Sequence, residues 1–303
     1  MTILILGGAD DDHAVHVHRE LSTRQSDAEF LDTRHFPTRL QIAYDPAGGA
    51  GHFVLENRRK IKFDEIQAIY WRCYNGVGAA DLPDAEQSHI ARNDARSLLE
   101  SLLIDLPVRW VNGWHAFQLH QTKAVAFQSV AKLGVPVPAT LLANDTDAVR
   151  AFAAAHPRCI FKPVQGGAHT RRLTGDHLTD ENLLTLSVAP VTLQEEIEGT
   201  NIRVFVAGER VLACEVRTEA IDFRDDIEPR IVAVDLPAEI AEQSLRIARS
   251  LELLWTGIDF RRTPAGEYYF LEANPSPMFL GFERRSGLPL TSALVNLLTS
   301  PHP

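Results

Sequence analysis

The most informative stretch of the chain is WTGIDFRRTPAGEYYFLEANP, residues 255–275. It predicts a β-hairpin, because two runs rich in aromatic and β-branched residues flank a Pro-Ala-Gly turn. That turn brings Asp259 level with Glu272, and the alternation of side chains along a strand puts Asn274 on the same face as Glu272. Oxygen donors without His or Cys favour Mg²⁺, which often binds substrate phosphates as well. The same pattern also suits the plain polar face of an antiparallel hairpin.

Two lysines favour the metal interpretation over the plain polar face. Lys162 ends a predicted strand and precedes Gly166 and Gly167, where the backbone can approach an anion closely. Lys123 lies within a predicted helix. Either lysine alone suits an ordinary surface charge. The chain has no Walker A sequence, no G-x-G-x-x-G after the first strand and no G-x-S-x-G elbow. A phosphate site would therefore consist of lysines, a small glycine loop and a metal held by carboxylates.

The first part of the chain, residues 1–115, predicts an α/β domain. Its expected elements are strands at 3–6, 28–31 and 66–72, and helices at 13–21 and 84–103. The order strand, helix, strand is typical of a parallel sheet. Residues 43–51 have the composition of a loop, since they combine Asp45, Pro46 and three glycines.

Two further segments are expected after this domain, a central one at 116–192 and a C-terminal one at 193–303 that contains the metal candidates. Their expected elements are helices at 116–133, 147–155, 238–254 and 291–298, a strand at 159–163, and hairpins at 202–216 and 255–274. The whole chain is thus a mixture of helices and strands of the α/β or α+β class.

Composition excludes several classes of function. The 303 residues are 45% hydrophobic and 23% charged, as in folded domains. A formal net charge of -10 and the absence of a basic run argue against nucleic acid as a partner. The three cysteines never form C-x-x-C, so neither structural zinc nor a disulfide framework is expected. Such cysteine usage suits a reducing compartment, and a cytoplasmic location is expected. The first apolar run is too short for a membrane helix, and no membrane association is expected.

Together these motifs resemble those of the ATP-grasp ligases, and most closely the microviridin-type graspetide synthetases, which are peptide-macrocyclising relatives of the RimK-like ligases. The resemblance covers nearly the whole chain. Its most specific part is the D…E-x-N set, and residues 121–123 with 134–140 resemble the opening of the nucleotide domain. Asp222-Phe223-Arg224 resembles the Asp-aromatic-Arg signature of graspetide synthetases, and Tyr70-Trp71-Arg72 resembles the Trp-centred motif of their N-terminal domain. The resemblance implies an ATP-grasp fold preceded by an α/β pre-ATP-grasp domain.

The resemblance also implies a role for each site residue. The implied metal ligands for Mg²⁺ are Asp259, Glu272 and Asn274. The implied ATP contacts are Lys123, Lys162, Gly166, Gly167, the adenine hinge Gln194, Glu195, Glu196 and Ile197, and the ribose contact Asn201. The implied catalytic residues are Arg203, Asp222 and Arg224, of which the two arginines would hold the substrate carboxylate or acyl phosphate. Each of these arginines also suits a structural ion pair.

The sequence departs from the family pattern in its short glycine loop and at three single positions. Glu196 stands where an aromatic or aliphatic residue is frequent, so either Glu195 or Glu196 would contact the adenine. Asn201 stands where an acid is common, and Cys73 stands where a second Arg often follows Arg72.

The implied activity is ADP-forming ligation, in which ATP converts a carboxylate to an acyl phosphate that an amine or hydroxyl captures. For a graspetide synthetase the partner is a precursor peptide with a leader and an acidic core, the product is a lactone or lactam, and the enzyme is a homodimer. A RimK-like ligase that adds a free amino acid is the first alternative. A catalytically silent ATP-binding protein is the second, and the metal set with both lysines argues against it.

Other features are interpreted as structural. Residues 10–12, all Asp, suit the N-terminal cap of the first helix. The H-x-x-H-x-H run from His13 to His18 does not place all three rings on one helical face. Trp71 and Cys214 are interpreted as core residues.

Overall fold

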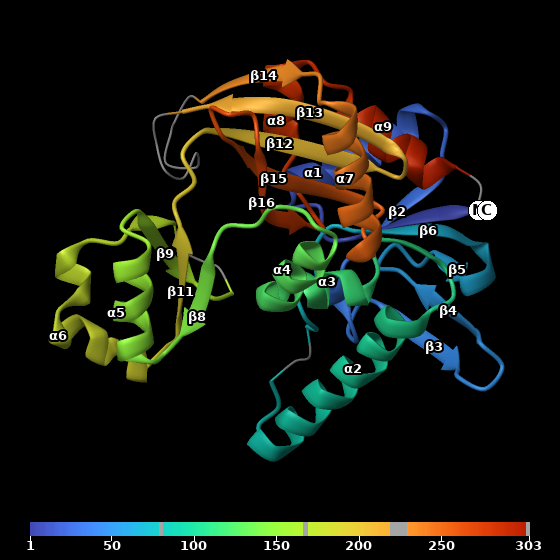
Figure 1. Ribbon diagram of the computed structural model, residues 1–303. Coiled ribbons are helices and arrows are strands. Elements are labelled where there is room, and N and C mark those ends of the chain that lie inside the picture. Colours follow the sequence, from blue (N-terminus) through green and yellow to red (C-terminus); the bar gives the residue numbers. More distant parts are fainter. Residues whose placement is uncertain (79–80, 166–168, 219–228, 301–303) are drawn as a thin grey trace.

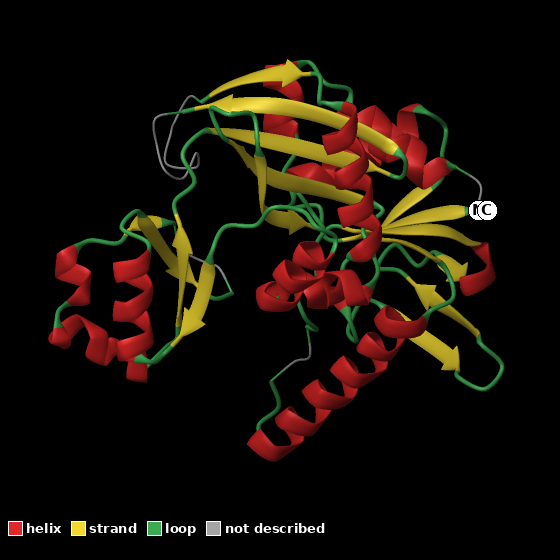
Figure 2. Cartoon of the chain, viewed as in Figure 1, coloured by secondary structure: helices red, strands yellow, loops and turns green. Residues whose placement is uncertain are grey.

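The computed structural model describes residues 1–78, 81–165, 169–218 and 229–300, which form four β-sheets with flanking helices (Figures 1 and 2). A parallel sheet of order β2-β1-β6-β7 forms the N-terminal domain. Its strands are β1 (Thr2–Leu6), β2 (Ala28–Leu31), β6 (Ile66–Trp71) and β7 (Arg109–Val111), with helices α1 (Asp12–Thr23) and α2 (Ala85–Asp105). The predicted parallel α/β arrangement is confirmed, because the buried apolar strand β1 lies in the middle of the sheet.

The prediction of a loop at residues 43–51 is wrong. A three-stranded antiparallel sheet stands there, formed by β3 (Gln41–Asp45), β4 (Ala50–Val54) and β5 (Lys60–Lys62). Only residues 46–49 form the turn. Turn residues dominate this stretch and hide the alternation of Ile42 and Tyr44, which pack on a core with Phe53.

The helix predicted at 116–133 is two helices, α3 (Trp114–Gln121) and α4 (Lys123–Lys132). Thr122 separates them with φ −96° and ψ 64°, outside the helical region. Lys123 is therefore the first residue of α4 and does not lie in the middle of a helix. Both helices pack against the large C-terminal sheet through Ala116 and Val130.

The large sheet is antiparallel and has the order β14-β13-β12-β15-β16. Its strands are β12 (Thr200–Ala207), β13 (Arg210–Arg217), β14 (Arg230–Val234), β15 (Trp255–Arg262) and β16 (Tyr268–Asn274). Both predicted hairpins are confirmed, and Gly208 and Gly266 have the positive φ that their turns require. Residues of β12 alternate between two cores: Val204 packs with α7 (Ala238–Ser250), whereas Phe205 packs with α8 (Leu280–Ser286) and α9 (Leu290–Thr299).

The small sheet has the order β10-β9-β11-β8 and its own core, and it lies to one side of the molecule in Figure 1. Its strands are β8 (Thr140–Ala143), β9 (Cys159–Pro163), β10 (Arg171–Arg172) and β11 (Val191–Glu195), and its helices are α5 (Thr146–Ala155) and α6 (Asp180–Leu183). Short 3-10 turns lie at Thr33–His35, Phe63–Glu65, Gly175–Leu178 and Leu184–Ser187. The boundary expected at 192/193 falls within β11, which pairs along its length with β8 and β9 and so belongs to this sheet.

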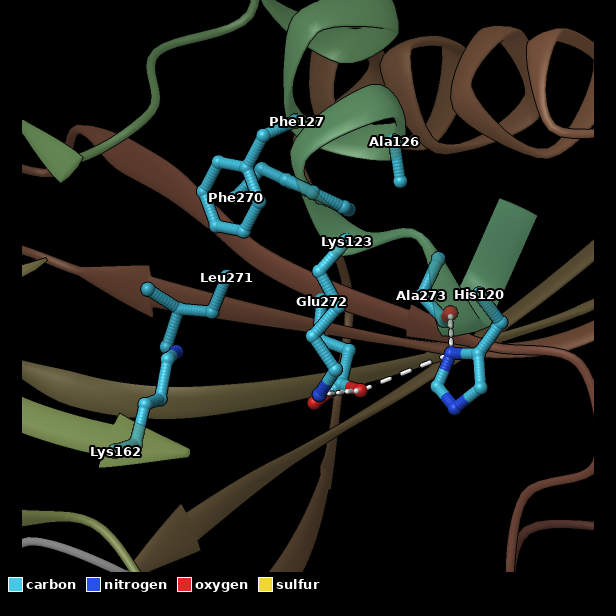
Figure 3. A pocket seen from close by; sticks show the side chains of 9 residues that line it. All are labelled: His120, Lys123, Ala126, Phe127, Lys162, Phe270, Leu271, Glu272 and Ala273. Atoms are coloured by element: carbon cyan, nitrogen blue, oxygen red, sulfur yellow. Dashed lines mark hydrogen bonds and ion pairs between the residues drawn. The ribbon is translucent and has the colours of Figure 1, made fainter. Parts of the chain in front are cut away.

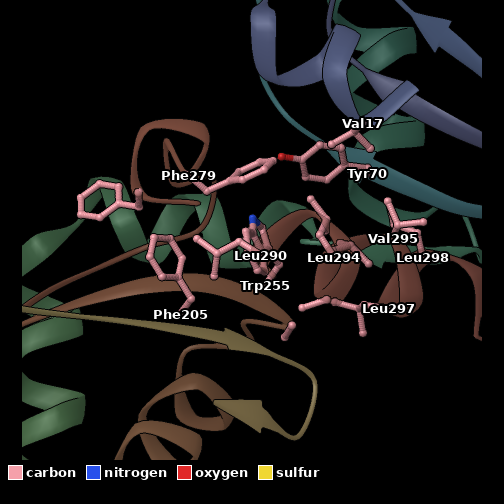
Figure 4. Close-up of a cluster of buried hydrophobic side chains, with 14 of the residues drawn as sticks. Val17, Tyr70, Phe205, Trp255, Phe279, Leu290, Leu294, Val295, Leu297 and Leu298 are labelled. Atoms are coloured by element: carbon pink, nitrogen blue, oxygen red, sulfur yellow. The ribbon is translucent and has the colours of Figure 1, made fainter. Parts of the chain in front are cut away.

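One hydrophobic core joins the N-terminal domain to the large sheet (Figure 4). Val17 and Tyr70 of the N-terminal domain are buried together with Phe205, Trp255 and Phe279. The two parts are therefore packed as one body, and the N-terminal sheet supports the strands that carry the metal candidates. In the described part of the chain, no helix has the length and apolar character needed to cross a bilayer.

The features interpreted as structural behave accordingly. Asp11 caps α1, since its carboxylate accepts a hydrogen bond from the Ala14 amide at 2.7 Å. Trp71 is buried and stacks on Phe117 at 4.6 Å between ring centroids. Cys214 is fully buried in the core.

His13 should make the protein less stable in acid. It is buried on α1 against the Phe279 ring, and burial, with the nearby Arg72 charge, lowers the pKa of His13 to about 4. Between the unfolded pKa of about 6.5 and the folded value, only the unfolded chain takes up the proton, so stability falls as pH falls. At about pH 5 this costs roughly 2 kcal/mol relative to pH 8.

Urea unfolding of the wild type and His13→Gln at both pH values tests this expectation. The loss of unfolding free energy between about pH 8 and pH 5 should be roughly 2 kcal/mol smaller in the variant. An equal loss in both proteins would show that His13 does not carry the pH dependence.

Candidate functional site

A row of charged residues crosses the large sheet. Arg203 on β12 is the register partner of Asp259 on β15, and Asp259 is in turn the partner of Glu272 on β16. The predicted alignment of Asp259 with Glu272 is confirmed. Asn274 pairs with Gly257 at the end of the same hairpin. A register shift beside Asp259 marks a β-bulge, a device that often re-aims side chains next to active sites.

Arg203 is buried and forms an ion pair with the half-buried Asp259. Its Nη1 donates to Asp259 Oδ2 at 2.5 Å, and only 8% of its side chain is exposed. The guanidinium lies over two aromatic rings, 5.6 Å from the centroid of Phe205 and 5.5 Å from that of Phe282. A side chain at Gly257 would come within 2.8 Å of Arg203 Nε, so a residue without a Cβ is needed there. Arg203 thus neutralises a carboxylate that is itself a candidate metal ligand.

Glu272 is held by Lys123 and His120 from the α3–α4 region (Figure 3). Lys123 Nζ donates to Glu272 Oε1 at 2.9 Å, and His120 Nδ1 lies 3.7 Å from the same oxygen and 3.1 Å from the Ala273 carbonyl. Burial alone raises the pKa of Glu272, but the Lys123 charge opposes it most strongly. With His120 and Lys162 adding to this effect, the pKa of Glu272 is lowered below its usual value. The carboxylate is therefore ionised at neutral pH.

Lys162 projects from the small sheet toward the same place, held by a chain of polar groups. Its Nζ donates to Gln194 Oε1 at 3.1 Å, and Gln194 Nε2 donates to Thr140 Oγ1 at 3.0 Å. Gln194 is 1% exposed, so its amide is committed to these partners. The structure thus places Gln194 behind Lys162, where it orients the lysine.

The two lysines and Glu272 line one cavity between the small and large sheets, shown in Figure 3. Its lining consists of His120, Lys123, Ala126, Phe127, Lys162, Phe270, Leu271, Glu272 and Ala273. Cations at one side and apolar rings at another suit a ligand with an anionic part and an apolar part. Sequence reasoning missed His120, because a lone histidine three residues before a lysine carries no distinctive signal.

The predicted hinge forms a second hollow, lined by Glu195, Glu196, Ile197, Glu198, Thr263, Pro264 and Tyr269. Arg172 binds both oxygens of Glu196, at 2.7 and 3.0 Å, and lowers the pKa of its carboxyl despite the opposing effect of burial. The Glu195 carboxylate instead accepts a long hydrogen bond of 3.4 Å from the Ala139 amide. The sequence left open whether Glu195 or Glu196 contacts the adenine. Of these two carboxylates, Glu196 is already neutralised by Arg172.

Arg261 connects this hinge to Asn201. Its Nε donates to the Ile197 carbonyl at 3.0 Å and its Nη1 to Asn201 Oδ1 at 2.7 Å. With its oxygen bound to Arg261, Asn201 offers a ligand the amide NH₂ donor, where an acid would offer an acceptor. Sequence reasoning missed Arg261, because its partners lie 60 or more positions away in the chain.

Comparison with known families matches this architecture to one of them. Residues 120–298, more than half of the chain, match the RimK-like ATP-grasp domain. The chain belongs to the RimK-like ATP-grasp family. The predicted ATP-grasp fold is confirmed, and in this RimK-like ATP-grasp chain both lysines and all three metal candidates fall within the matched residues.

Relatives of this RimK-like ATP-grasp chain fall into two groups. A probable alpha-L-glutamate ligase of Legionella pneumophila (strain Corby) is 27% identical over 201 residues, which are 60% of this chain and 64% of that protein. The chain thus spans less than two thirds of the length of the curated relative. The structure of the ATP-grasp ligase PsnB complexed with minimal precursor is 31% identical, with a TM-score of 0.85 over 98% of this chain and 97% of PsnB.

The macrocyclase MdnC bound with precursor peptide MdnA, from Microcystis aeruginosa MRC, has a TM-score of 0.85 over 99% of this chain and 100% of MdnC. At 23% identity, this likeness shows a shared fold.

Four of the predicted site residues, Gly166, Gly167, Asp222 and Arg224, lie outside the described residues. A further hollow is lined by Gly199, Thr200, Asn201, Glu215, Val216, Arg217, Thr218 and Arg261. Within it, Glu215 accepts hydrogen bonds from Arg217 at 2.8 Å and Arg262 at 3.2 Å. Sequence reasoning missed this group, because alternating charges on a strand are usual for a solvated face.

Proposed function

We propose that this chain is an ATP-dependent, ADP-forming ligase that uses Mg²⁺ and joins a carboxylate to a hydroxyl or an amine. Its proposed substrate is a precursor peptide with a leader and an acidic core, in which it forms ester or amide links between side chains. The observation that carries the proposal is the cavity in which Lys123, Lys162 and Glu272 meet between two sheets. Its cytoplasmic location and homodimeric state stay predictions.

The donor set at the hairpin fits Mg²⁺. Asp259, Glu272 and Asn274 offer only hard oxygen ligands, and Mg²⁺ typically takes one or two carboxylates and completes its coordination with phosphates and water. Within the described ranges, no three His, Cys, Asp or Glu residues cluster as an all-protein cage would require. When bound, Mg²⁺ would neutralise charge on the phosphates.

The nucleotide contacts follow from the same geometry. Lys123 and Lys162 would bind phosphate oxygens from opposite sides of the cavity, with Gln194 holding Lys162 in place. Glu195 and the hinge backbone would contact the adenine, because Arg172 already neutralises Glu196. Asn201 would donate to a ribose hydroxyl. Gly166 and Gly167 stay predicted phosphate contacts.

The proposed reaction overcomes the low reactivity of a carboxylate. A carboxylate oxygen of the substrate attacks the γ-phosphorus of ATP, and ADP leaves. A hydroxyl or amine then attacks the acyl carbon, loses its proton, and expels phosphate that retains the carboxylate oxygen. Two anions must approach in the first step, so the chain's cations have to compensate their repulsion. Arg203 and the predicted Arg224 are proposed to hold the substrate carboxylate or acyl phosphate, and Asp222 stays a predicted catalytic residue.

The similarity to PsnB supports a peptide as substrate. It extends over nearly the full length of both chains at 31% identity, and PsnB was solved with its minimal precursor. The name of the curated relatives favours a second candidate, the addition of free glutamate to an acceptor. That match covers only 60% of this chain, whereas the match with PsnB includes the N-terminal domain.

Product mass with coupled ADP detection separates the two candidates. The protein is incubated with ATP, MgCl₂ and an acidic-core peptide, with or without free glutamate. Crosslinking predicts ADP release without glutamate and a peptide that loses one water per link. ADP release that requires glutamate, with a peptide that gains its residue mass, would support the second candidate. Peptide-stimulated ADP release in neither mixture would count against both.

A further inference from the structure

We propose that the N-terminal domain positions Asn274 by holding the segment directly after it through two residues, Arg72 and Asn112. The inference rests on the proposed function, because it concerns the metal site assigned there. Arg72 and Asn112 are positioning residues, since neither belongs to the proposed metal or nucleotide contacts.

Arg72 grips Ser276, two residues beyond Asn274. Its Nη1 donates to the Ser276 carbonyl at 2.9 Å and to Ser276 Oγ at 2.7 Å, and Ser276 Oγ donates back to the Arg72 carbonyl at 2.7 Å. Asp11 fixes the other side of the guanidinium, accepting from Arg72 Nε at 3.0 and 3.1 Å. Only 10% of the Arg72 side chain is exposed. Such a fork with both ends bound sets the position of Ser276.

Asn112 binds Pro275, the residue between Asn274 and Ser276. Its Nδ2 donates to the Pro275 carbonyl at 2.6 Å and the Trp255 carbonyl at 2.7 Å. Its Oδ1 accepts from the amides of Leu254 at 2.7 Å and Trp255 at 3.1 Å. This fully buried side chain therefore ties the start of β15 to the residue that follows β16.

Hydrogen bonds from neighbouring residues then fix Asn274 itself. The Ser276 amide donates to Asn274 Oδ1 at 2.8 Å, and Thr256 Oγ1 donates to the Asn274 carbonyl at 2.8 Å. An amide oxygen has two lone pairs, so this bond orients Oδ1 and leaves one lone pair for a cation. Partners of this kind, which bind a metal ligand without touching the metal, commonly change metal affinity 10- to 100-fold, as an order of magnitude.

The two positioning residues, and the Asp11 that fixes Arg72, come from one edge of the N-terminal sheet. Asp11, Arg72 and Asn112 follow β1, β6 and β7, which are neighbouring parallel strands. The carboxyl edge of such a sheet is where open α/β folds usually bind ligands. Here that edge holds the protein's own strand end, which gives the N-terminal domain a part in the metal site.

Manganese binding, measured by electron paramagnetic resonance at saturating ADP, tests the inference in the full chain. Ser276→Ala and Arg72→Lys should each weaken Mn²⁺ binding by about tenfold or more, because each disrupts the hydrogen bonds between Arg72 and Ser276. Arg34→Ala is the matched control. Arg34 forms ion pairs with Asp10 and Asp32, at 2.6 and 2.7 Å, near the same sheet edge, and its change should leave Mn²⁺ binding unaltered.

The outcomes separate this inference from the proposed function. A wild type that binds no Mn²⁺ with ADP would overturn the proposed metal site and this inference with it. Normal Mn²⁺ binding in the wild type and in both test variants would overturn this inference alone. Equal weakening by Arg34→Ala would overturn it too, because the effect would then be general loosening of the domain. Thermal unfolding checks that each variant is folded. If Ser276→Ala does not fold, Mn²⁺ binding by Arg72→Lys tests the inference.

Discussion

Replacing Glu272 by Ala should abolish ATP turnover while the protein stays folded. The carboxylate is a candidate metal ligand and also accepts a hydrogen bond from Lys123, so its loss removes a metal contact and a partner of the lysine at once. We expect turnover to fall by at least about 10²-fold, the usual scale for losing one preorganised electrostatic contact. Steady-state ADP release with peptide present measures the effect.

The hairpin supplies a matched control for this prediction. Glu267 is an exposed carboxylate near the β15–β16 turn and is absent from the cavity lining, so Glu267→Ala should keep normal turnover. Because Glu272 and Lys123 are partly exposed, the cost in stability should lie between about 1 kcal/mol for a surface pair and roughly 3 kcal/mol for a buried one. Normal ADP release by Glu272→Ala would remove Glu272 from the proposed site.

Replacing Arg203 by Met should damage both stability and turnover. It leaves Asp259 with a charge that has lost its buried partner, for which a cost of about 3 kcal/mol is typical. Turnover should fall by about 10²-fold or more, since Asp259 loses its orientation and the proposed substrate contact is removed. Urea unfolding and ADP release measure the two effects on the same protein. Arg210→Met, an exposed change on β13, is the control for both.

A second substitution separates the two effects of Arg203. Adding Asp259→Asn to Arg203→Met removes the uncompensated charge, so most of the lost stability should return. Turnover should not return, because the double variant lacks a proposed metal ligand and a proposed substrate contact. If restoring stability also restored turnover, the role of Arg203 would be purely structural.

Sequence reasoning succeeded where local pattern determines geometry. The hairpin pattern placed Asp259 opposite Glu272, as observed. The register next to the turn, with Phe260 opposite Phe270, would by itself bring Leu271 to Asp259, and the extra residue of the β-bulge restores Glu272 to that position. The β-bulge beside Asp259 was not predictable, because it depends on packing across the whole sheet and not on the hairpin sequence.

The missed features involve contacts between distant segments. Thr122 and its neighbours suit a continuous helix, and only the packing of α3 and α4 reveals the break that puts Lys123 at the start of α4. Gln194 was assigned to the hinge from its place in a motif, whereas its side chain holds Lys162, 32 positions away. Pairings of this kind are properties of the folded chain.

The acidic chain is compatible with the anionic ligand proposed for it. Its net charge is -10, but the relevant cations are local: Lys123 and Lys162 face one cavity, and Arg203 neutralises Asp259. Net charge affects the long-range attraction or repulsion of a ligand, which salt screens beyond about 10 Å. It does not determine the local charge of a site formed by a few side chains.

The transfer of heavy oxygen from peptide to phosphate tests the central claim most directly. An acidic-core peptide whose side-chain carboxylates carry heavy oxygen is incubated with the protein, ATP and MgCl₂, and both products are analysed by mass spectrometry. Activation of the carboxylate by ATP predicts one labelled oxygen in the released phosphate for every link formed, together with the loss of one water from the peptide. Links formed with unlabelled phosphate would show that the peptide carboxylate is not activated by ATP, and would contradict the account.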